Sequence, residues 1–394
     1  MLALSALNQK PIVCFMPSYD TIILGAGGVG SAAAFHLARR GVRVLAIEQF
    51  GGGHDRGSSH GETRVIRQAY FEHPDYVPLL LRAYQLWREL EASTGLRLLE
   101  QVGLLQVGPS DGIVVPGVLR AAEQHGLDVE PLSSSQAERR FPGFKIPTEM
   151  SAVFEPAAGY LRVEPCVLAH LAAAKIAGAE LAFNTNVLTW QADSSGVRVT
   201  TDRGEYRAAR LVITAGAWAP QLLADLGCPM QVLRKHAYWF SSSSPAMRQD
   251  GNCPTFLFEM PEGVFYGFPQ IDAQGVKVAR HSGGQPVDDP LTDPRTADKP
   301  DQALVTDFLG TCIPSVGPPL IRSSVCFYTL SPDEHFIVDR HPRHANVTFA
   351  AGLSGHGFKF TSVLGEALAD LSMRGTSELP LQFLRLSRLT GSSF

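Results

Sequence analysis

Residues 19–30 read YDTIILGAGGVG, an apolar run that leads directly into the glycine pattern G-x-G-x-x-G. In this pattern the first glycine, Gly25, permits a tight turn, and the second, Gly27, lets the backbone approach a pyrophosphate. The third, Gly30, lets a helix pack closely on a strand, and Gly28 lies in the same turn. The stretch predicts a strand and a phosphate-binding turn at the start of a helix.

The segments that follow complete a larger unit. Residues 31–40 are rich in alanine and favour a helix, which Gly41 ends, and residues 42–47 form a second apolar run that leads to Glu48. Strand, glycine turn, helix, strand and acid within about 30 residues are typical of the dinucleotide-binding βαβ unit. Glu48 would bind an unphosphorylated ribose and repel a 2′-phosphate, which disfavours NADP. The pattern does not separate FAD from NAD.

Composition argues against several other classes of protein. The 394 residues are 45% hydrophobic and 18% charged, with a net charge of -4 and no cluster of Lys and Arg, so nucleic acid is not an expected partner. No apolar run approaches the roughly 20 residues that a membrane span needs. The six cysteines form no CxxC pair. We therefore expect neither a disulfide framework nor a metal site, and a reducing compartment.

Two later apolar runs that end in glycine, residues 211–216 and 347–352, indicate further buried strands of the nucleotide-binding sheet. Between them lie short alternating runs and many prolines, as expected of an inserted antiparallel domain. We predict an α/β fold, α+β overall, in which the Rossmann-like domain is discontinuous. The predicted segments are 18–95, 155–225 and 322–394 for the nucleotide-binding domain, 96–154 and 226–321 for the substrate domain, and 1–17 for an extension.

Two arginines follow the βαβ unit in the segment SSHGETRVIR, residues 58–67. Arg64 and Arg67 are three residues apart and share one face if this segment is helical. Such a pair is suited to bidentate binding of carboxylate or flavin oxygens. A solvated charged face is the alternative.

Three other segments carry polar or reactive side chains. Strand alternation places Lys277 and His281 on one face, which is either a binding site or a wet sheet surface. Cys326 lies in an apolar run, where a free cysteine is usually a packing residue. The loop at residues 354–359 comes between a strand and an apolar helix, and it predicts a second anion site at the positive end of a helix.

In this order the segments resemble the monomeric sarcosine oxidase family, which also contains N-methyltryptophan oxidase and is similar to D-amino-acid oxidase in architecture. The resemblance covers residues 20–388, nearly the whole chain. It rests on the glycine pattern and on SHGETR at residues 59–64, YGFP at 266–269, CFYT at 326–329, DEHFI at 333–337, SGHGFK at 354–359 and FLRLSR at 383–388.

The resemblance implies FAD as the cofactor, bonded through a thioether to Cys326. It implies that Arg67 and Lys359 clamp the carboxylate of the substrate, and that Tyr266, His281 and Tyr328 line the pocket. The predicted catalytic residues are Lys277, Arg64, His281 and Tyr266. The predicted cofactor-binding residues are Gly25, Gly27, Gly28, Gly30, Glu48, Ser58, His60, Thr63, Arg64, Gly216, Trp218, Cys326, Gly352, Gly355, His356, Gly357 and Lys359.

The same resemblance implies an oxidase of a small secondary amine. A hydride equivalent passes from the carbon next to the amine nitrogen to the flavin, the imine hydrolyses, and O2 is reduced to H2O2. Sarcosine or another N-methyl amino acid is the expected substrate, with release of formaldehyde, and L-pipecolate and N-methyl-L-tryptophan are the nearest rivals. The family suggests a monomer, and residues 391–394 carry no peroxisomal tripeptide, so we expect the cytoplasm.

Other classes of function remain open on the sequence. One is a non-catalytic flavin-binding subunit, against which the complete set of predicted site residues argues. An NAD-dependent dehydrogenase would explain the glycine pattern but neither the Cys326 segment nor the loop at residues 354–359. A dehydrogenase of this fold with an electron-transfer partner is the last. Lys277 favours the oxidase, because its charge would stabilise the negative charge that develops on O2.

Overall fold

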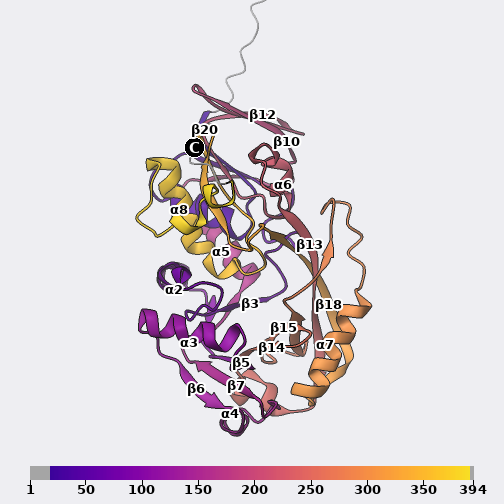
Figure 1. The fold of residues 1–394 in the computed structure, drawn as a ribbon. Coiled ribbons are helices and arrows are strands. Elements are labelled where there is room, and N and C mark those ends of the chain that lie inside the picture. Colours follow the sequence, from indigo (N-terminus) through magenta and orange to yellow (C-terminus); the bar gives the residue numbers. More distant parts are fainter. Residues whose placement is uncertain (1–17, 391–394) are drawn as a thin grey trace, which may run out of the picture.

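The computed structural model describes residues 18–390, so the predicted extension at residues 1–17 lies outside the described part of the chain. Within the described part, two large sheets lie toward opposite ends of an elongated molecule (Figure 1). The glycine pattern belongs to the first sheet, whereas Tyr266, Lys277 and Tyr328 belong to strands of the second.

The first sheet has eight strands in the described residues. They are β10 (Val187–Asp193), β11 (Gly196–Thr201), β12 (Gly204–Ile213), β1 (Ser18–Leu24), β2 (Val44–Ile47), β9 (Glu180–Ala182), β19 (Ile337–His341) and β20 (His344–Ala351). β1 pairs in parallel with β2 and β12, and β12 pairs in parallel with β20, so the carboxyl ends of these four strands lie at one edge. The strands predicted at residues 211–216 and 347–352 are found in β12 and β20.

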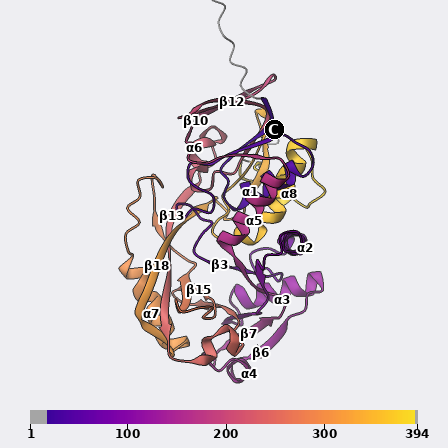
Figure 2. The same ribbon diagram turned by 180° about the vertical axis from the view of Figure 1, so that it is seen from behind.

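Three helices cover one face of this sheet, and Figure 2 shows them side by side. They are α1 (Gly28–Ala38), α5 (Val163–Ile176) and α8 (Thr361–Arg374). The side chains of β1 alternate between the two faces of the sheet. Ile23 packs with the helices, whereas Ile22 and Leu24 pack on the opposite face. The sheet is buried on both faces, which explains why its central strands are continuous apolar runs.

The predicted helices are present with shifted ends. The first was predicted at residues 31–40, but α1 begins at Gly28, because the end of the glycine turn is already its first turn. A further helix, α2 (Val77–Thr94), has Pro78 in its first turn. It ends where Gly95 adopts a left-handed φ of 70°, a common helix terminus.

The second sheet has nine strands, again counted over the described residues. They are β17 (Gln285–Pro286), β13 (Gln231–Ser242), β16 (Val276–Arg280), β15 (Gly263–Gly267), β14 (Thr255–Met260), β5 (Leu104–Pro109), β7 (Met150–Glu155), β6 (Glu130–Ser133) and β18 (Val316–Leu330). Its pairs are antiparallel, as predicted, except that β5 and β14 are parallel. Three helices that the sequence analysis did not predict contact its strands, namely α3 (Val114–His125), α4 (Ser134–Arg140) and α7 (Lys299–Cys312).

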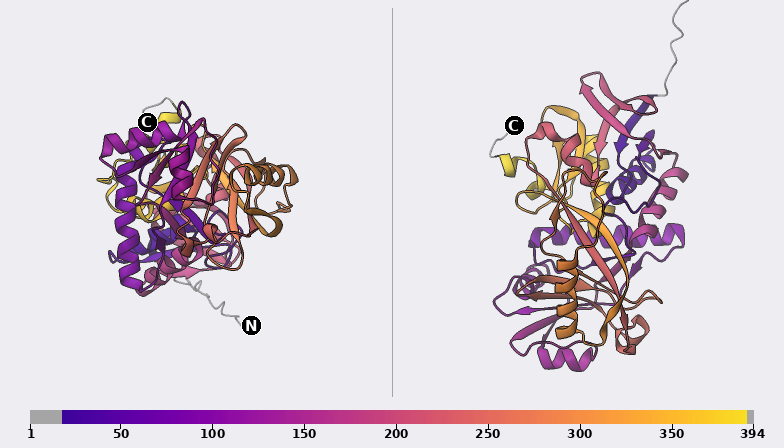
Figure 3. Two further views of the ribbon diagram at one scale, coloured as in Figure 1. Left: turned by 90° about the horizontal axis from the view of Figure 1, so that it is seen from below. Right: turned by 90° about the vertical axis from the view of Figure 1, so that its right-hand side faces the viewer.

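β13 and β18 form a long antiparallel pair that reaches from the second sheet toward the first (Figure 3). β18 crosses the predicted domain boundary between residues 321 and 322 without interruption. The assignment of segments to two domains stays a prediction. Both strands belong to the second sheet, and residues 214–230 and 331–336 connect them to β12 and β19 of the first sheet.

The remaining described elements are short. A sheet of three short strands consists of β3 (Thr63–Ile66), β8 (Gly159–Arg162) and β4 (Leu99–Glu100). The others are α6 (Ala219–Leu222), α9 (Ser387–Thr390), and the 3-10 turns η1 (Pro74–Tyr76), η2 (Gly216–Trp218), η3 (Ala224–Leu226), η4 (Pro245–Met247), η5 (Gln249–Gly251), η6 (Phe358–Phe360) and η7 (Gln382–Leu384). Within residues 18–390, no helix combines the length and the apolar character that crossing a membrane requires.

Candidate active site

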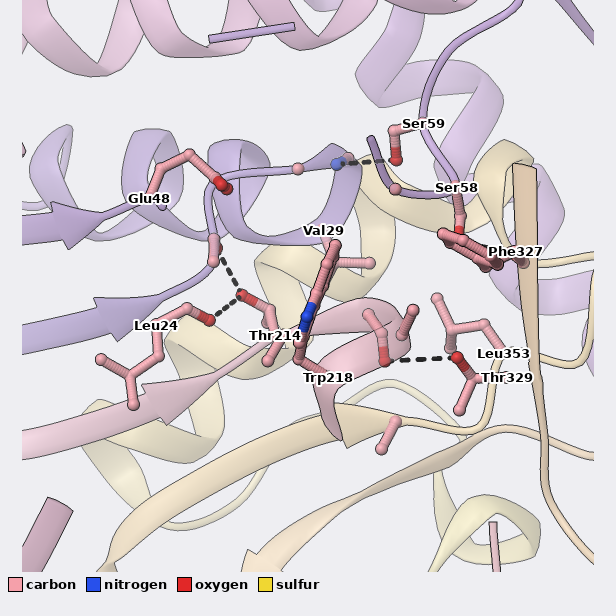
Figure 4. Close-up of a pocket in the computed structure, with 18 of the residues that line it drawn as sticks. Leu24, Val29, Glu48, Ser58, Ser59, Thr214, Trp218, Phe327, Thr329 and Leu353 are labelled. Atoms are coloured by element: carbon pink, nitrogen blue, oxygen red, sulfur yellow. Dashed lines mark hydrogen bonds between the residues drawn. The ribbon is translucent and has the colours of Figure 1, made fainter. Parts of the chain in front are cut away.

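A cavity of about 470 Å³ opens at the carboxyl ends of the parallel strands. Leu24 of β1 and Thr214 after β12 lie on its wall, and Figure 4 shows Glu48 at one side and Phe327 at the other. Ligands of parallel α/β sheets bind at this edge, where the strands end. The cavity therefore lies where the glycine pattern predicts a dinucleotide.

The glycines of the pattern have different structural roles. Gly25 has a φ of 88°, which favours glycine, and a Cβ on Gly30 would lie 1.8 Å from the Gly25 carbonyl oxygen. A Cβ on Gly27 would meet only Ser59 Oγ, at 3.7 Å, because Gly27 faces the cavity. α1 begins here without a side-chain cap from its N-cap residue, so its N-terminal N–H groups and positive dipole end favour a bound anion.

Two further side chains suit a nucleotide. Glu48 is buried, and its carboxylate accepts hydrogen bonds from Ala26 N (2.9 Å) and Phe50 N (3.1 Å), which leaves lone pairs for ribose hydroxyls. Trp218 Nε1 is buried at the cavity and has no hydrogen-bond partner among the described residues. At the wall of the cavity this donor is available to an acceptor of a bound ligand. Together with the open glycine turn, this donor and acceptor set fits FAD.

Residues 58–62 border the cavity and are held by hydrogen bonds to residues far away in the sequence. Ser58 Oγ donates to Phe327 O of β18 (2.5 Å). The Glu164 carboxylate accepts hydrogen bonds from Gly61 N (2.6 Å) and Glu62 N (3.0 Å). These bonds fix the backbone of the segment between the two large sheets.

The segment that carries the arginine pair is not helical, so the condition for a shared face is not met. Residues 63–66 form β3, which pairs with β8, and in an extended chain residues three apart point to opposite sides. Arg64 lines the cavity and donates to Ser58 O (3.0 Å) and Thr63 O (2.9 Å). Arg67 points to a different place, beside Tyr70.

Lys277 connects the second sheet to this segment. Its buried Nζ donates to Gly61 O (2.5 Å), Thr63 O (2.8 Å) and Thr63 Oγ1 (3.2 Å), so all three N–H groups of the ammonium have acceptors. Burial, with the nearby Arg64, lowers the pKa of Lys277. The structure thus places the buried amine of Lys277 against the backbone of residues 61–63, next to the residues that line the cavity.

Arg67 is held by an internal carboxylate. Its side chain is 3% exposed, and Nη2 lies 2.6 Å from both carboxylate oxygens of Glu72. Its guanidinium also lies 4.1 Å from the centroid of the Tyr70 ring and 4.4 Å from that of Phe71. The site is therefore already shaped to hold one carboxylate against an arginine.

Lys359 approaches the same place from the loop at residues 354–359. Its Nζ donates to His356 O (2.8 Å) and lies 3.5 Å from Tyr70 Oη. Burial, reinforced by Arg67, lowers the pKa of Lys359 to about 7. Burial would raise the pKa of Glu72, but Arg67, His356 and Lys359 outweigh it and hold the value at about 2. Two cations thus stabilise a carboxylate here.

An aromatic wall consists of Tyr266, His281 and Tyr328, the side chains that the resemblance assigns to the pocket, and of these three only Tyr328 lines the cavity. His281 Nδ1 lies 3.4 Å from Tyr328 Oη, and the ring centroids of Tyr266 and His281 are 6.4 Å apart. Burial lowers the pKa of His281 to about 4, so its ring is neutral near pH 7. Gly355 has a φ of 79°, and a Cβ there would lie 2.2 Å from the Tyr328 ring. The loop can therefore pack against this wall only with glycine at that position.

Cys326 is a free, half-buried thiol on β18. The next two residues, Phe327 and Tyr328, line the cavity. In a strand, successive side chains point to opposite faces, so Cys326 and Tyr328 project from the same face of β18. The thiol is thus at the border of the cavity on the side of the aromatic wall.

The predicted cofactor residues divide into two groups. Most line the cavity, whereas Gly30, His60, Thr63, Cys326, His356 and Lys359 lie around it. The His356 ring contacts Tyr70 Oη (2.6 Å) and Glu334 O (3.0 Å). The following helix, α8, begins only at Thr361, so His356 is not at its first turn.

Several residues of the site were not predicted from the sequence. Thr214 Oγ1 donates to Gly25 O (2.8 Å), and its place before a strand-ending glycine was an available signal. Tyr70, Glu72 and Glu164 carry no comparable local signal, because their partners are set by the fold.

One group in the described residues has the composition of a metal site, Asp225, His341 and His344. It lies at the amino end of β20, at the opposite edge of the sheet from the cavity. His341 Nδ1 accepts a hydrogen bond from Arg343 N, which places the ring proton on Nε2, and the Arg343 guanidinium binds Asp225.

Comparisons with known proteins agree with this geometry. Residues 20–371 match the family described as FAD dependent oxidoreductase. The chain is 44% identical to monomeric sarcosine oxidase of Streptomyces avermitilis, over 95% of this chain and 99% of that one. It is 39% identical to N-methyl-L-tryptophan oxidase of Yersinia pestis, over 94% and 99%.

A solved structure of NikD, an unusual amino acid oxidase essential for nikkomycin biosynthesis, superposes with a TM-score of 0.83 at 27% identity, over 94% of this chain and 98% of that one. Glycine oxidase of Geobacillus kaustophilus has the same fold, with a TM-score of 0.79 at 23% identity, over 95% and 99%. The predicted fold class and resemblance are confirmed. The chain belongs to the FAD dependent oxidoreductase family, in the group that contains monomeric sarcosine oxidase and N-methyl-L-tryptophan oxidase.

Proposed function

We propose that this flavoenzyme oxidises the C–N bond of a small N-methyl amino acid, with sarcosine as the first candidate, and carries FAD as a thioether to Cys326. The products are the demethylated amino acid, formaldehyde and H2O2. The similarity to a monomeric sarcosine oxidase supports the substrate class. L-Pipecolate and N-methyl-L-tryptophan are the rivals, the latter supported by the second relative. A monomer in the cytoplasm remains the prediction for its state and location.

The observation that carries this proposal is the pair of buried cations, Arg67 and Lys359, around one carboxylate. Glu72 satisfies Arg67 in the structure, and a substrate carboxylate has the same charge and shape. Binding the carboxylate at a fixed point orients the rest of an amino acid toward the cavity.

The protein's own groups supply binding, orientation and shielding. Arg67 and Lys359 would fix the carboxylate, while Tyr266 and Tyr328 would exclude water from the reacting carbon. His281 is neutral near pH 7, so it would add no positive charge beside the amine of the substrate. Bound FAD would accept a hydride equivalent from the substrate and pass the electrons to O2.

Anaerobic titration of the purified protein tests the proposal. Sarcosine, L-pipecolate and N-methyl-L-tryptophan are added in separate cuvettes, and the flavin band is followed. Bleaching by sarcosine at the lowest concentration is the expected result. Preference for either other amine would move the assignment to that substrate. A yellow protein that no amine bleaches would instead be a non-catalytic flavin-binding subunit.

Replacing Cys326 with serine is expected to abolish covalent attachment while leaving the cavity intact, because serine has nearly the same size. Acid precipitation should leave the yellow flavin in the supernatant of this variant and in the pellet of the wild type. Cys228→Ser is the matched control, since Cys228 is also a half-buried free thiol. Flavin that still precipitates with Cys326→Ser would refute the linkage.

Binding of a carboxylate should weaken as pH rises through about 7, because Lys359 then loses its charge in the free protein. Its lowered pKa means that the cation is present below that pH and absent above it. Methoxyacetate, a sarcosine analogue without a titratable amine, is the probe, and the flavin spectrum reports its Kd. The Kd should rise by up to about tenfold per pH unit. In Lys359→Met the same curve should be flat, and a wild-type slope there would contradict this assignment.

A further inference from the structure

Lys235 is a buried lysine that the proposed reaction does not use. It lies on β13 directly opposite Cys326 on β18 in the antiparallel pair. Directly opposite residues project from the same face, with Cβ atoms about 5 Å apart. The Lys235 side chain is 3% exposed, so the amine is enclosed on the face that carries the thiol.

The amine of Lys235 has two acceptors in the described residues. Nζ donates to Ser282 O (2.7 Å) and Gly283 O (2.9 Å), the carbonyl groups that follow His281. An ammonium has three N–H groups, so one is left without an acceptor. Lys277 differs, since its Nζ has three oxygen acceptors.

This geometry suits a neutral amine. A neutral amine has two N–H groups and one lone pair, and both N–H groups already have carbonyl acceptors, so the lone pair takes the remaining direction. Burial lowers the pKa of Lys235 to about 8, which makes the neutral form accessible near physiological pH. The charged or titratable groups around it are Cys326, Tyr328, Arg280, His281, Asp298 and Asp301.

Positive charge also gathers around the thiol. Arg295 Nη2 donates to Val325 O (2.8 Å), the residue before Cys326. Arg64 and Lys277 interact electrostatically with Cys326 as well. These cations would stabilise negative charge on Sγ, but none can take the thiol proton as simply as a neutral amine, because Arg stays protonated and Lys277 is saturated with acceptors.

We propose that Lys235 accepts the thiol proton of Cys326 when FAD becomes covalently attached, an inference that rests on the thioether of the proposed function. The S–H bond breaks and its proton moves to Lys235 Nζ. One C–H bond of the flavin ring methyl group breaks, and an S–C bond forms. The two electrons released would pass through the flavin to O2, which would form H2O2 with two protons, one lost from the methyl group and one given up by Lys235. Cys326 thus becomes a modification site, and Lys235 is its base.

Attachment can be followed without measuring turnover. Apoprotein is prepared from riboflavin-starved cells, mixed with FAD in air, and denatured in SDS at successive times, and flavin fluorescence in the protein band gives the rate. Wild-type attachment should accelerate as pH rises toward about 8, where Lys235 becomes neutral. In Lys235→Met attachment should be at least about tenfold slower, since a positioned base contributes about that much or more.

Two variants separate a base from a simple charge. Lys235→Arg keeps the charge but not the proton acceptor, so it should be as slow as Lys235→Met. Lys299→Met changes an exposed lysine and should attach FAD at the wild-type rate. Reversible FAD binding, measured by tryptophan quenching at early times, should be the same in all of them. This measurement excludes a collapsed cavity as the cause of slow attachment.

The outcomes distinguish a failure of the proposed role of Lys235 from a failure of the proposed thioether. Attachment at the wild-type rate in Lys235→Arg or Lys235→Met overturns the role of Lys235 and leaves the thioether intact. If the wild type never acquires covalent flavin, or if Cys326→Ser does, the linkage itself is wrong and the inference falls with it.

Discussion

Lys277→Met is expected to slow reoxidation of the reduced flavin by O2 by about 10²-fold to 10³-fold, the usual cost of removing a group that stabilises developing charge. Lys277 is a buried amine beside the backbone that borders the cavity. Its lowered pKa would also help it release a proton to the forming peroxide. Methionine keeps the length of the side chain and removes both properties.

Stopped-flow mixing of the anaerobically reduced enzyme with aerated buffer measures this rate. Reduction by substrate should change far less, because the amine is oxidised before O2 reacts. Lys145→Met, which alters an exposed lysine, is the control. Reoxidation at the wild-type rate in Lys277→Met would show that another group activates O2. It would also favour the alternative function, a dehydrogenase that passes its electrons to a separate electron acceptor.

Arg67→Met is expected to lower kcat/KM for sarcosine by about 10²-fold, the cost of truncating one partner of a buried charge pair. The loss should appear mainly in KM, since Arg67 binds the carboxylate rather than the reacting carbon. An amine that lacks a carboxylate, such as N-methylethylamine, should lose almost nothing. Steady-state H2O2 production with both substrates gives the comparison.

A second variant controls for a loss of activity that results only from destabilisation of the fold. Arg67→Met alone leaves the Glu72 carboxylate buried without its partner, which would destabilise the fold. Arg67→Met combined with Glu72→Gln removes both charges and should show the same selective loss. Arg120→Met at an exposed position is the matched control. Equal losses for both substrates in the double variant would mean that Arg67 does not recognise the carboxylate.

The parts of the site that could be predicted from the sequence are those determined by residues close together in the chain. The turn at residues 25–30 was recognisable because Gly25 has a positive φ, Gly27 faces the cavity and Gly30 meets the backbone of Gly25. Helix α7 was missed although its signals were local too, since Asp298 caps its N-terminus and Val305, Phe308, Leu309 and Cys312 recur at helical spacing.

Other features could not be read from adjacent residues. The β3 strand exists because it pairs with β8, a partner far along the chain, and its own residues fit either a helix or a strand. Glu164 reaches the segment at residues 58–64 from a helix about a hundred residues later. The pairing of Arg67 with Glu72 depends on how the chain turns after β3, which no periodicity encodes.

The ladder formed by β13 and β18 also has a consequence for how the protein melts. The pair lies in the second sheet and extends from Leu233 opposite Tyr328, beside the cavity, to Ser242 opposite Val316 at the other end. Separating the two halves would break the hydrogen bonds that Phe327 O and Thr329 O of this ladder accept from Ser58 Oγ and Ser354 N, so heat should unfold them in one cooperative transition. A calorimetric scan should then show a single peak, and tightly held FAD should raise the melting temperature of the whole molecule rather than that of the nucleotide-binding half alone.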